Sequence, residues 1–260
     1  MSAFDIIGAI AVLPLFTKNP KKEAVRIMND NRSIKSVYMK AGKISGRLRR
    51  SNLKFISGER KKETVHRESG CVFKLDVEKC YFSPRLGNDR LDVAKKVKPG
   101  EKVLVMFSGV GPYPIVIAKN SRAKEVYGIE LNRIATKYAL ENARLNKLGN
   151  VKFIQGDVKK IIPKLSRKIK FDRIIMARPQ LKDDFLASAL QIAKEGTIIH
   201  FYDFLQEEDM PEKAYEKINN AVGRAKKKLK WLEAWKLIGW KKALEIGPRK
   251  WRIRADFFVF

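Results

Sequence analysis

The middle of the chain alternates short, mainly apolar runs with longer stretches of mixed polar and apolar residues. The apolar runs are typical of strands buried on both faces, and the mixed stretches are typical of helices that cover a sheet. We therefore expect strands at 102–107, 125–130, 151–154, 171–176 and 197–202, and helices that begin at 114–118 or run over 134–146 and 183–193. Strands that alternate with helices specify a parallel, doubly wound α/β sheet of the Rossmann type.

Residues 1–75 show a different pattern, with short runs of partial alternation and one helical stretch. The alternating runs lie at 36–40, 43–45 and 53–57, and the helical stretch at 21–29 follows Asn19-Pro20. Alternation of period two predicts strands, and proline after asparagine is typical of a helix start. We therefore expect a small N-terminal α+β domain at 1–75 and a larger α/β domain at 76–260.

The chain after Pro211 is rich in lysine and tryptophan. We expect a long basic helix at 212–230 and a last strand at 251–260 that joins the edge of the sheet. Trp231 and Trp235 lie four residues apart and would share one helix face. Tryptophans placed in this way pack into the core or stack on bases, and we favour the core.

Composition places the chain among soluble globular proteins, because 45% of its 260 residues are hydrophobic and 32% are charged. The opening apolar run, 6–16, is interrupted by Gly8 and Pro14, is too short to span a bilayer and lacks the basic start of a signal peptide. Cys71 and Cys80 are too few for a disulfide framework and lack metal-ligand spacing. We expect reduced cysteines, no metal, no membrane attachment and a cytoplasmic location.

The chain carries a net charge of +28, from 56 basic and 28 acidic residues. The excess gathers in two flanks: residues 1–75 hold 17 basic and 6 acidic residues, and residues 213–254 hold 14 and 3. A thermophilic bias toward lysine would raise glutamate as well, and glutamate does not keep pace here. The charge exceeds what solubility requires and indicates a polyanionic partner. We expect the flanks to grip a nucleic-acid backbone on either side of a less charged core.

A glycine-containing turn follows the first strand of the expected sheet. Gly109 and Gly111 lie in Ser-Gly-Val-Gly-Pro, a turn that lets a ligand approach the backbone closely. Glu130 ends the next strand about 20 residues on, the spacing at which an acid binds ribose hydroxyls. Asp157 ends the third strand, where a carboxylate can accept from an adenine amino group. Because Pro114 stands where a phosphate-binding turn has its third glycine, the combination favours S-adenosylmethionine over NAD.

Several runs of the sequence carry a family resemblance. They are Tyr81-Phe-Ser-Pro-Arg-Leu-Gly-Asn-Asp-Arg90, Met106-Phe-Ser-Gly-Val-Gly-Pro112 and Ile198-Ile-His-Phe-Tyr202, with Gly46-Arg-Leu-Arg49, Gly58-Glu59 and His66-Arg-Glu-Ser-Gly70 upstream. Together they resemble the archaeal and eukaryotic tRNA (guanine-37 N1)-methyltransferase family, whose superfamily includes wyosine-pathway enzymes. The resemblance implies a class I methyltransferase domain, S-adenosyl-L-methionine as cofactor and tRNA as partner, with residues 1–75 contacting the RNA. We expect a monomer that lacks the separate N-terminal domain many members carry.

The resemblance also implies roles for single residues. Arg49 matches the arginine that contacts the guanine oxygen, and Asp89 stands where the family has glutamate as general base. Guanine N1 holds a proton at neutral pH, so its attack on a sulfonium methyl requires a base, and a cation near O6 stabilises the developing charge. The expected cofactor-binding residues are Tyr81, Phe107, Gly109, Gly111, Glu130 and Asp157. Arg85 and Arg178 are expected to contact the RNA substrate, and Pro179 is retained from a catalytic Asn-Leu-Pro.

Three positions depart from the family pattern, and all are expected around one pocket. Asp89 is one methylene shorter than glutamate, and misplacement of such a group by about 1 Å can cost around 100-fold in rate. Ala177 replaces the asparagine that would contact the target base, and Val105 replaces an aspartate near the cofactor. Arg178 is then the side chain that could supply a new polar contact to the base.

Our prediction is the formation of N1-methylguanosine at position 37 of tRNA, and three alternatives stay open. The first is transfer of the 3-amino-3-carboxypropyl group of the same cofactor, as in the wyosine-pathway paralogue. The second is methylation of a tricyclic guanosine intermediate, and the third is tRNA binding without catalysis after decay of the pocket. The Pro-Arg-Leu-Gly run favours methyl transfer. His66 and His200, the only histidines, are expected to be structural.

Overall fold

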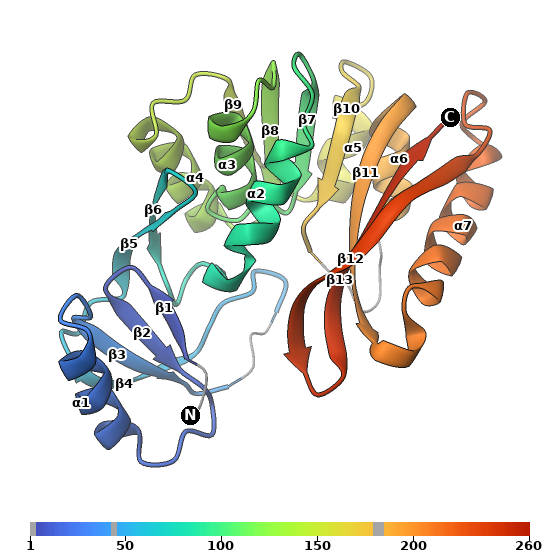
Figure 1. Cartoon of the computed structure of the whole chain (residues 1–260). Coiled ribbons are helices and arrows are strands. Elements are labelled where there is room, and N and C mark those ends of the chain that lie inside the picture. Colours follow the sequence, from blue (N-terminus) through green and yellow to red (C-terminus); the bar gives the residue numbers. More distant parts are fainter. Residues whose placement is uncertain (1–3, 43–45, 179–184) are drawn as a thin grey trace.

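The computed structural model describes residues 4–42, 46–178 and 185–260, and its largest part is a seven-stranded sheet (Figure 1). The strand order is β12-β13-β11-β10-β7-β8-β9. These strands are β7 (Lys102–Met106), β8 (Glu125–Glu130), β9 (Val151–Gln155), β10 (Phe171–Met176), β11 (Ala193–Gln206), β12 (Trp235–Gly247) and β13 (Lys250–Val259). The five strands from β11 to β9 run parallel, while β13 and β12 are antiparallel. The predicted parallel α/β sheet is confirmed.

Helices cover both faces of the large sheet, so its strands are apolar on both sides. On β7, Val103 and Val105 belong to the core under α2, α3 and α4, while Leu104 and Met106 belong to the core under α5, α6 and α7. These helices are α2 (Gly87–Lys95), α3 (Pro112–Asn120), α4 (Arg133–Leu145), α5 (Val158–Leu165), α6 (Leu186–Ile192) and α7 (Glu212–Lys226). This double coverage explains the unbroken apolar run of β7. None of the described helices is long and apolar enough to cross a membrane.

The N-terminal segment forms a second, four-stranded sheet in the order β1-β2-β3-β4. It consists of β1 (Asp5–Ile7), β2 (Ile10–Leu13), β3 (Ser36–Lys40) and β4 (Leu53–Gly58), with α1 (Pro20–Asp30) packed on it. The predicted helix at 21–29 and strands at 36–40 and 53–57 are confirmed, and the strand expected at 43–45 lies outside the described residues. The division of the chain at residue 75 stays a prediction.

A hairpin of β5 (Glu63–Glu68) and β6 (Cys71–Asp76) joins the small sheet to the large one. Two asparagines of the α4 region bind the free edge of β6 as a neighbouring strand would. The Asn142 amide accepts from Lys74 N at 2.7 Å and donates to Lys74 O at 3.1 Å. The Asn146 amide accepts from Val72 N at 2.8 Å and donates to Val72 O at 2.7 Å. The hairpin is thereby fixed to the helix that follows Glu130.

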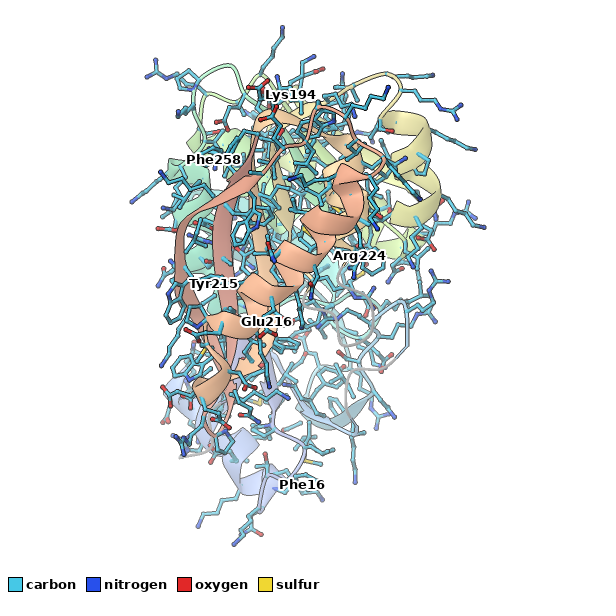
Figure 2. All side chains as sticks on the ribbon, turned by 90° about the vertical axis from the view of Figure 1, so that its right-hand side faces the viewer. Phe16, Lys194, Tyr215, Glu216, Arg224 and Phe258 are labelled. Atoms are coloured by element: carbon cyan, nitrogen blue, oxygen red, sulfur yellow. The ribbon has the colours of Figure 1, made fainter. Side chains whose placement is uncertain are left out.

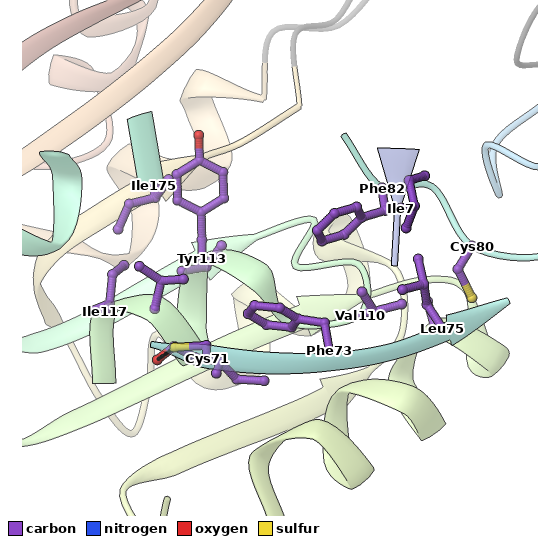
Figure 3. Close-up of a cluster of buried hydrophobic side chains, with 14 of the residues drawn as sticks. Ile7, Cys71, Phe73, Leu75, Cys80, Phe82, Val110, Tyr113, Ile117 and Ile175 are labelled. Atoms are coloured by element: carbon purple, nitrogen blue, oxygen red, sulfur yellow. Dashed lines mark hydrogen bonds between the residues drawn. The ribbon is translucent and has the colours of Figure 1, made fainter. Parts of the chain in front are cut away.

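The inner face of β6 packs against α3 and the turn that precedes it (Figure 3). Phe73 and Leu75 are fully buried beside Val110 and Tyr113, in a core that continues to Ile7 of the small sheet. Cys71 and Cys80 lie in the same core as free thiols, and burial raises the pKa of Cys71 to about 11 and that of Cys80 to about 12. One continuous core therefore connects the small sheet with the glycine turn.

The C-terminal part of the chain differs from the prediction. Helix α7, which carries Tyr215 and Arg224, crosses one face of the large sheet (Figure 2). Trp235 then begins β12 instead of continuing a helix from Trp231, and the last strand, β13, lies inside the sheet with β12 at the edge. Partly buried and exposed residues alternate over 235–242, the period of a strand with one packed face. Trp235 packs on Phe257, with ring centroids 5.7 Å apart, so it belongs to the core as we favoured.

Candidate active site

A cavity of about 730 Å³, including its open mouth, lies at the carboxyl ends of β7, β8 and β10. Ligands of doubly wound sheets bind at this edge. The small-sheet side contributes residues of the segment that precedes β4, and β13 contributes one residue from the opposite side. The polar and aromatic residues that line the cavity include Arg47, Arg49, Tyr81, Ser83, Arg90, Phe107, Ser108, Gly109, Tyr113, Glu130, Asn132, Arg178 and Arg252.

The glycine turn after β7 adopts a backbone that few residues other than glycine tolerate. Phe107, Gly109 and Gly111 have φ values of 64°, 58° and 90°, in the left-handed region. A Cβ on Gly111 would come within 2.9 Å of the Phe153 ring. The turn then passes directly into α3, whose first residue is Pro112. Phe107 and Gly109 line the cavity, whereas Gly111 supports the turn from behind.

Glu130 ends β8 and faces the cavity beside this turn. Its two carboxylate oxygens accept backbone N–H groups, one from Gly109 at 2.8 Å and one from Asn132 at 2.7 Å. These bonds fix the carboxylate while leaving acceptor capacity for the hydroxyls of a ribose. Ser108 adds a buried hydroxyl that has no hydrogen-bond partner among the described residues. The fixed acid, the open glycine and the unpaired hydroxyl fit a nucleoside such as that of S-adenosylmethionine.

Asp157 lies beside the cavity and not in its wall. It caps α5 by accepting from Lys159 N at 2.9 Å, and it forms an ion pair with Arg47, which does line the cavity. Although partial burial opposes ionisation, the Lys159 amide and the Arg47 guanidinium hold the pKa of Asp157 below its usual range. The carboxylate is therefore charged, and Arg47 connects it to the cavity wall.

Two predicted arginines face the same cavity. Arg49 stacks on Tyr81, with its Cζ 3.9 Å from the ring centroid, and Arg178 lies over Phe107 at 5.8 Å. Burial lowers the pKa of both guanidinium groups, and repulsion contributes because Arg252 lies near Arg49 and Arg49 near Arg178. Arginine stays protonated despite such shifts. The cavity wall is therefore strongly cationic, with Glu130 as the acid among these arginines.

Asp89, the predicted base, lies behind the cavity wall. Its side chain is 3% exposed, and one of its oxygens accepts from the hydroxyls of both Tyr113, at 2.6 Å, and Tyr202. The other oxygen accepts from Arg254 at 2.7 Å. Tyr113 itself lines the cavity, so it separates Asp89 from the cavity while remaining bonded to it. Burial, and then the Asp89 carboxylate, raise the pKa of Tyr113. The tyrosine is therefore protonated and donates a hydrogen bond to Asp89.

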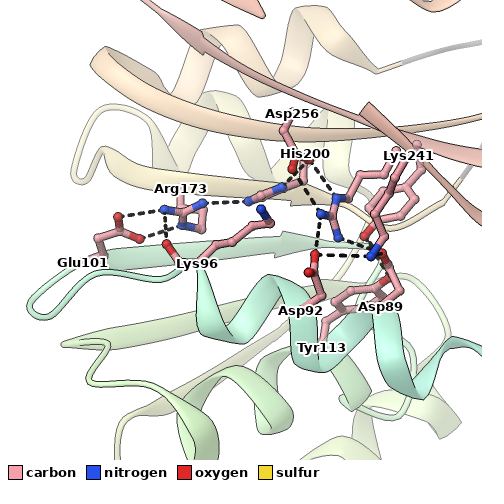
Figure 4. Close-up of polar contacts among 11 residues, drawn as sticks. Asp89, Asp92, Lys96, Glu101, Tyr113, Arg173, His200, Lys241 and Asp256 are labelled. Carbon is pink, nitrogen blue, oxygen red and sulfur yellow. Dashed lines mark hydrogen bonds and ion pairs between the residues drawn. The ribbon is translucent and has the colours of Figure 1, made fainter. Parts of the chain in front are cut away.

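Asp89 is the end of a chain of buried charges that crosses the sheet (Figure 4). Arg254 bonds Asp256 at 2.8 Å, and Asp256 bonds His200 Nδ1 at 2.7 Å. Arg173 donates to His200 Nε2 at 2.8 Å. Because Nε2 must accept from a guanidinium, the proton of the neutral imidazole lies on Nδ1 and points to Asp256. His200 is therefore structural, as predicted.

Of the remaining predicted residues, Arg85 lies outside this cavity and Tyr81 lies in its wall. Arg85 is exposed, forms an ion pair with Asp5 at 2.6 Å and lines a second, wider cleft between the small sheet and the β12–β13 hairpin. Tyr81 lines both spaces and connects them. Ala177 and Arg178 end the described part of their segment, and the predicted Pro179 lies outside the described residues.

Sequence reasoning missed two residues of this site. Tyr113 follows the glycine turn. It lines the cavity, and its hydroxyl donates a hydrogen bond to Asp89 behind the wall. Arg252 reaches the cavity from β13, on which Arg252, Arg254 and Asp256 share one face. Charged residues at a spacing of two within a buried strand were a visible signal of a polar interior.

The fold, the glycine turn and the fixed acid define the class I S-adenosylmethionine-dependent methyltransferase fold. The family model described as TRM5/TYW2 methyltransferase domain matches residues 64–230, and the chain belongs to this family of tRNA-modification enzymes. The family predicted from the sequence is thus confirmed.

Three relatives illustrate the range of the family. The tRNA (guanine(37)-N(1))-methyltransferase Trm5b of Pyrococcus abyssi is 39% identical over 99% of this chain and 75% of its own length, and its crystal structure matches with a TM-score of 0.86, over 99% of this chain and 74% of that one. The tRNA 4-demethylwyosine(37)-methyltransferase Taw21 of Saccharolobus solfataricus is 39% identical over 76% of each chain. The structure of M. jannaschii TYW2 in complex with AdoMet matches with a TM-score of 0.73 and 26% identity, over 99% and 100% of the two chains.

Proposed function

We propose that the protein methylates N1 of guanosine 37 in tRNA. One observation carries the proposal: a single cavity is lined both by a carboxylate, Glu130, that two backbone amides fix and by a cluster of arginines. A carboxylate fixed by backbone amides suits a nucleoside cofactor, and guanidinium groups suit the acceptor-rich edge of guanine. Cofactor and target base would therefore share one space.

The cofactor side of the cavity is formed by the glycine turn and the end of β8. S-adenosylmethionine supplies, when bound, a methyl group activated by its sulfonium charge. Glu130 accepts the ribose hydroxyls, and Phe107 provides an apolar wall. Gly109 leaves room for the ligand, because a Cβ there would meet only the Tyr81 carbonyl, at 3.7 Å. We assign the adenine amino group to Asp157, reached at the edge of the cavity beside Arg47.

Asp89 takes the N1 proton through Tyr113 in this proposal. The N1–H bond of guanine breaks as the Tyr113 oxygen accepts its proton, and the Tyr113 hydroxyl proton passes to Asp89, to which it is already bonded at 2.6 Å. The tyrosine is neutral before and after the transfer, so its raised pKa is no obstacle. A base that acts through a hydroxyl compensates for the shorter side chain of aspartate.

Arg49 is placed to stabilise the negative charge that develops on guanine O6 as N1 loses its proton. Its stacking on Tyr81 fixes the guanidinium plane before the substrate arrives. Preorganised donors of this kind are usually the largest electrostatic contribution to catalysis. Arg178, over Phe107, adds positive charge at the same end of the cavity.

We propose tRNA as the macromolecular substrate because of charge and family together. Of the net charge of +28, the two flanks, 1–75 and 213–254, hold +11 each. Phosphate neutralisation by lysine and arginine dominates affinity for nucleic acids. The relatives from Pyrococcus abyssi and Saccharolobus solfataricus are both named for modification of position 37 of tRNA.

A second candidate is methylation of a tricyclic guanosine derivative at the same position. Ala177 favours it, because the small side chain lines the cavity at the point where the family resemblance places an asparagine, and this leaves space for an additional ring. The similarity to Taw21, which covers 76% of this chain, points in the same direction.

Product analysis distinguishes these reactions. The protein is incubated with S-adenosylmethionine and an unmodified tRNA transcript, and the digested nucleosides are identified by mass spectrometry. We expect N1-methylguanosine together with S-adenosylhomocysteine, and no product from a matched transcript with adenosine at position 37. Methylthioadenosine would instead indicate transfer of the aminocarboxypropyl group. Methylation of a tricyclic base in preference to guanosine would replace the first candidate by the second.

A further inference from the structure

Four arginines of the large domain are almost fully buried, and one of them differs from the rest. Three are paired with carboxylates: Arg90 with Glu68, Arg173 with Glu101, and Arg254 with Asp89, Asp92 and Asp256. Arg252 is 2% exposed, and among the described residues no carboxylate lies within ion-pair distance of it. A buried cation without a counter-charge is costly, so its presence calls for a ligand that uses it.

The contacts of Arg252 orient it without satisfying it. One terminal nitrogen donates to the Ala177 carbonyl at 2.8 Å, and the guanidinium lies over the Tyr202 ring, with its Cζ 4.6 Å from the centroid. Its Nε is buried and has no hydrogen-bond partner among the described residues. The bond to Ala177 and the stacking on Tyr202 restrain the plane of the guanidinium, while most of its five donors stay unused among the described residues.

The position of Arg252 separates it from the cofactor. It lines the main cavity from β13, opposite Phe204 of β11, whereas Glu130 marks the ribose end at β8. Arg252 bonds the backbone of Ala177, the residue that follows β10. The guanidinium therefore lies next to the place where the side-chain amide of the family pattern is missing.

We infer that Arg252 recognises the target guanine through its O6 and N7 edge, in place of the amide that Ala177 lacks. This inference rests on the proposed function. A guanidinium offers a planar fork of donors, and O6 with N7 is the pair of adjacent acceptors that guanine presents to such a fork. Arg49 and Arg252 then approach the carbonyl from different sides, which explains why two cations are tolerated in one pocket.

The test combines a substitution in the protein with one in the substrate. Arg252→Met keeps the length of the side chain and removes the charge, and Arg167→Met, at an exposed arginine far from the cavity, is the matched control. With guanosine at position 37 we expect Arg252→Met to lower kcat/KM by about 100-fold or more, the cost of losing one preorganised donor group. Its affinity for S-adenosylmethionine, measured by calorimetry, stays that of the wild type, and its Tm is equal or higher because an unpaired buried charge is removed.

A transcript with 7-deazaguanosine at position 37 keeps N1, O6 and the amino group and lacks only N7. We expect wild type and Arg167→Met to react more slowly with it than with guanosine, whereas Arg252→Met reacts with both at the same rate. The inference would be overturned if the analogue slowed wild type and Arg252→Met by the same factor. It would also be overturned if Arg252→Met reacted with the guanosine transcript at nearly the rate of Arg167→Met. If the wild type forms no N1-methylguanosine at all, the proposed function fails. Calorimetry still tests the contact of Arg252 with N7 in that case, because it compares the affinity of the protein for the guanosine transcript with that for the 7-deazaguanosine transcript.

Discussion

At the scale of single residues, the site is decided by what each charged side chain is bonded to. Glu130 and Asp89 are both acids of the predicted site, yet Glu130 faces the cavity with backbone partners and Asp89 is covered by two tyrosines and Arg254. Asp89 does not line the cavity, and Tyr113 lies between its carboxylate and the cavity. In the proposed reaction, proton removal at guanine N1 therefore depends on Tyr113 and Asp89 together.

Asp89→Asn should separate proton transfer from cofactor binding. The amide can accept from the tyrosine hydroxyls but cannot take a proton, so we expect the single-turnover rate to fall by about 10²- to 10⁴-fold, the usual contribution of a general base. Affinity for S-adenosylmethionine, measured by calorimetry, stays unchanged because Asp89 does not line the cavity. Tyr113→Phe should slow the same step. Full activity of Tyr113→Phe, with Asp89→Asn inactive, would show that the proton follows another route.

From the sequence alone, Gly109 and Glu130 were predicted to lie at one site, whereas Tyr113 and Arg252 of the same cavity were missed. Gly109 and Glu130 were predicted because their spacing in a strand-turn-helix unit is fixed by the fold. Arg252 lies 75 residues beyond Ala177 in the sequence, and their contact depends on the register of β13 with β11. No local pattern encodes such a register, so the substrate end had to come from the structure.

At the scale of elements, the sequence predicted the strands that are buried on both faces. It was misleading for β12, an edge strand in which partly buried and exposed residues alternate. The five parallel strands were predicted correctly because each centres on apolar residues, most completely in β7. Trp231 and Trp235 have helical spacing, yet Trp235 lies in an edge strand, because pairing with β13 and packing on Phe257 outweigh the weak local preference. The α5 helix was not expected, since its few residues carry a proline at position 163.

Gly111 tests the element that positions the cofactor. Gly111→Ala introduces a Cβ 2.9 Å from the Phe153 ring at a φ of 90°, and we expect a loss of about 1–3 kcal/mol in the free energy of unfolding. For a chain of this size each kcal/mol lowers Tm by roughly 2–4 °C in thermal unfolding.

Gly149→Ala is the matched control, because a Cβ there meets nothing within 4 Å. The double variant Gly111→Ala, Phe153→Leu should recover part of the loss, since it removes the clash and keeps the left-handed backbone. A Tm of Gly111→Ala equal to that of the control would mean that the turn relaxes without cost.

At the scale of the whole molecule, the chain of buried charges runs along one face of the large sheet and ends behind the cavity wall (Figure 4). It begins at Glu101, passes through Arg173 and His200 to Asp256, and ends at Asp89. Every member is nearly inaccessible to solvent, so the network is sensitive to any change of protonation. The same residues that restrain the proposed base therefore make folding depend on pH.

Acidification should destabilise the protein in two stages. Burial, helped by the neighbouring arginines and opposed by Asp256, lowers the pKa of His200 from its ordinary 6.5. The unfolded chain then binds a proton that the folded chain excludes, so stability falls as the pH drops below about 6.5. His200 and Arg254 outweigh burial and hold the pKa of Asp256 at about 2, against 3.8 ordinarily, so its stabilising effect is complete above 3.8 and disappears as the pH falls toward 2.

Scanning fluorimetry from above pH 6.5 down to about pH 2 covers both stages and measures them through Tm. His200→Gln should abolish the first stage, because an amide accepts from Arg173 and donates to Asp256 without titrating. His66→Gln, outside the network, is the matched control and should keep it. A first stage that persists in His200→Gln would assign the acid sensitivity to another group.

The two asparagines beside β6 have a consequence for assembly. A strand with one unpaired side exposes a row of backbone donors and acceptors on which another molecule can add a strand, and this is a common start of aggregation. Asn142 and Asn146 occupy four such groups, those of Val72 and Lys74. These two side chains thus protect the hairpin from edge-to-edge association, because another strand cannot bind the groups that the asparagines occupy.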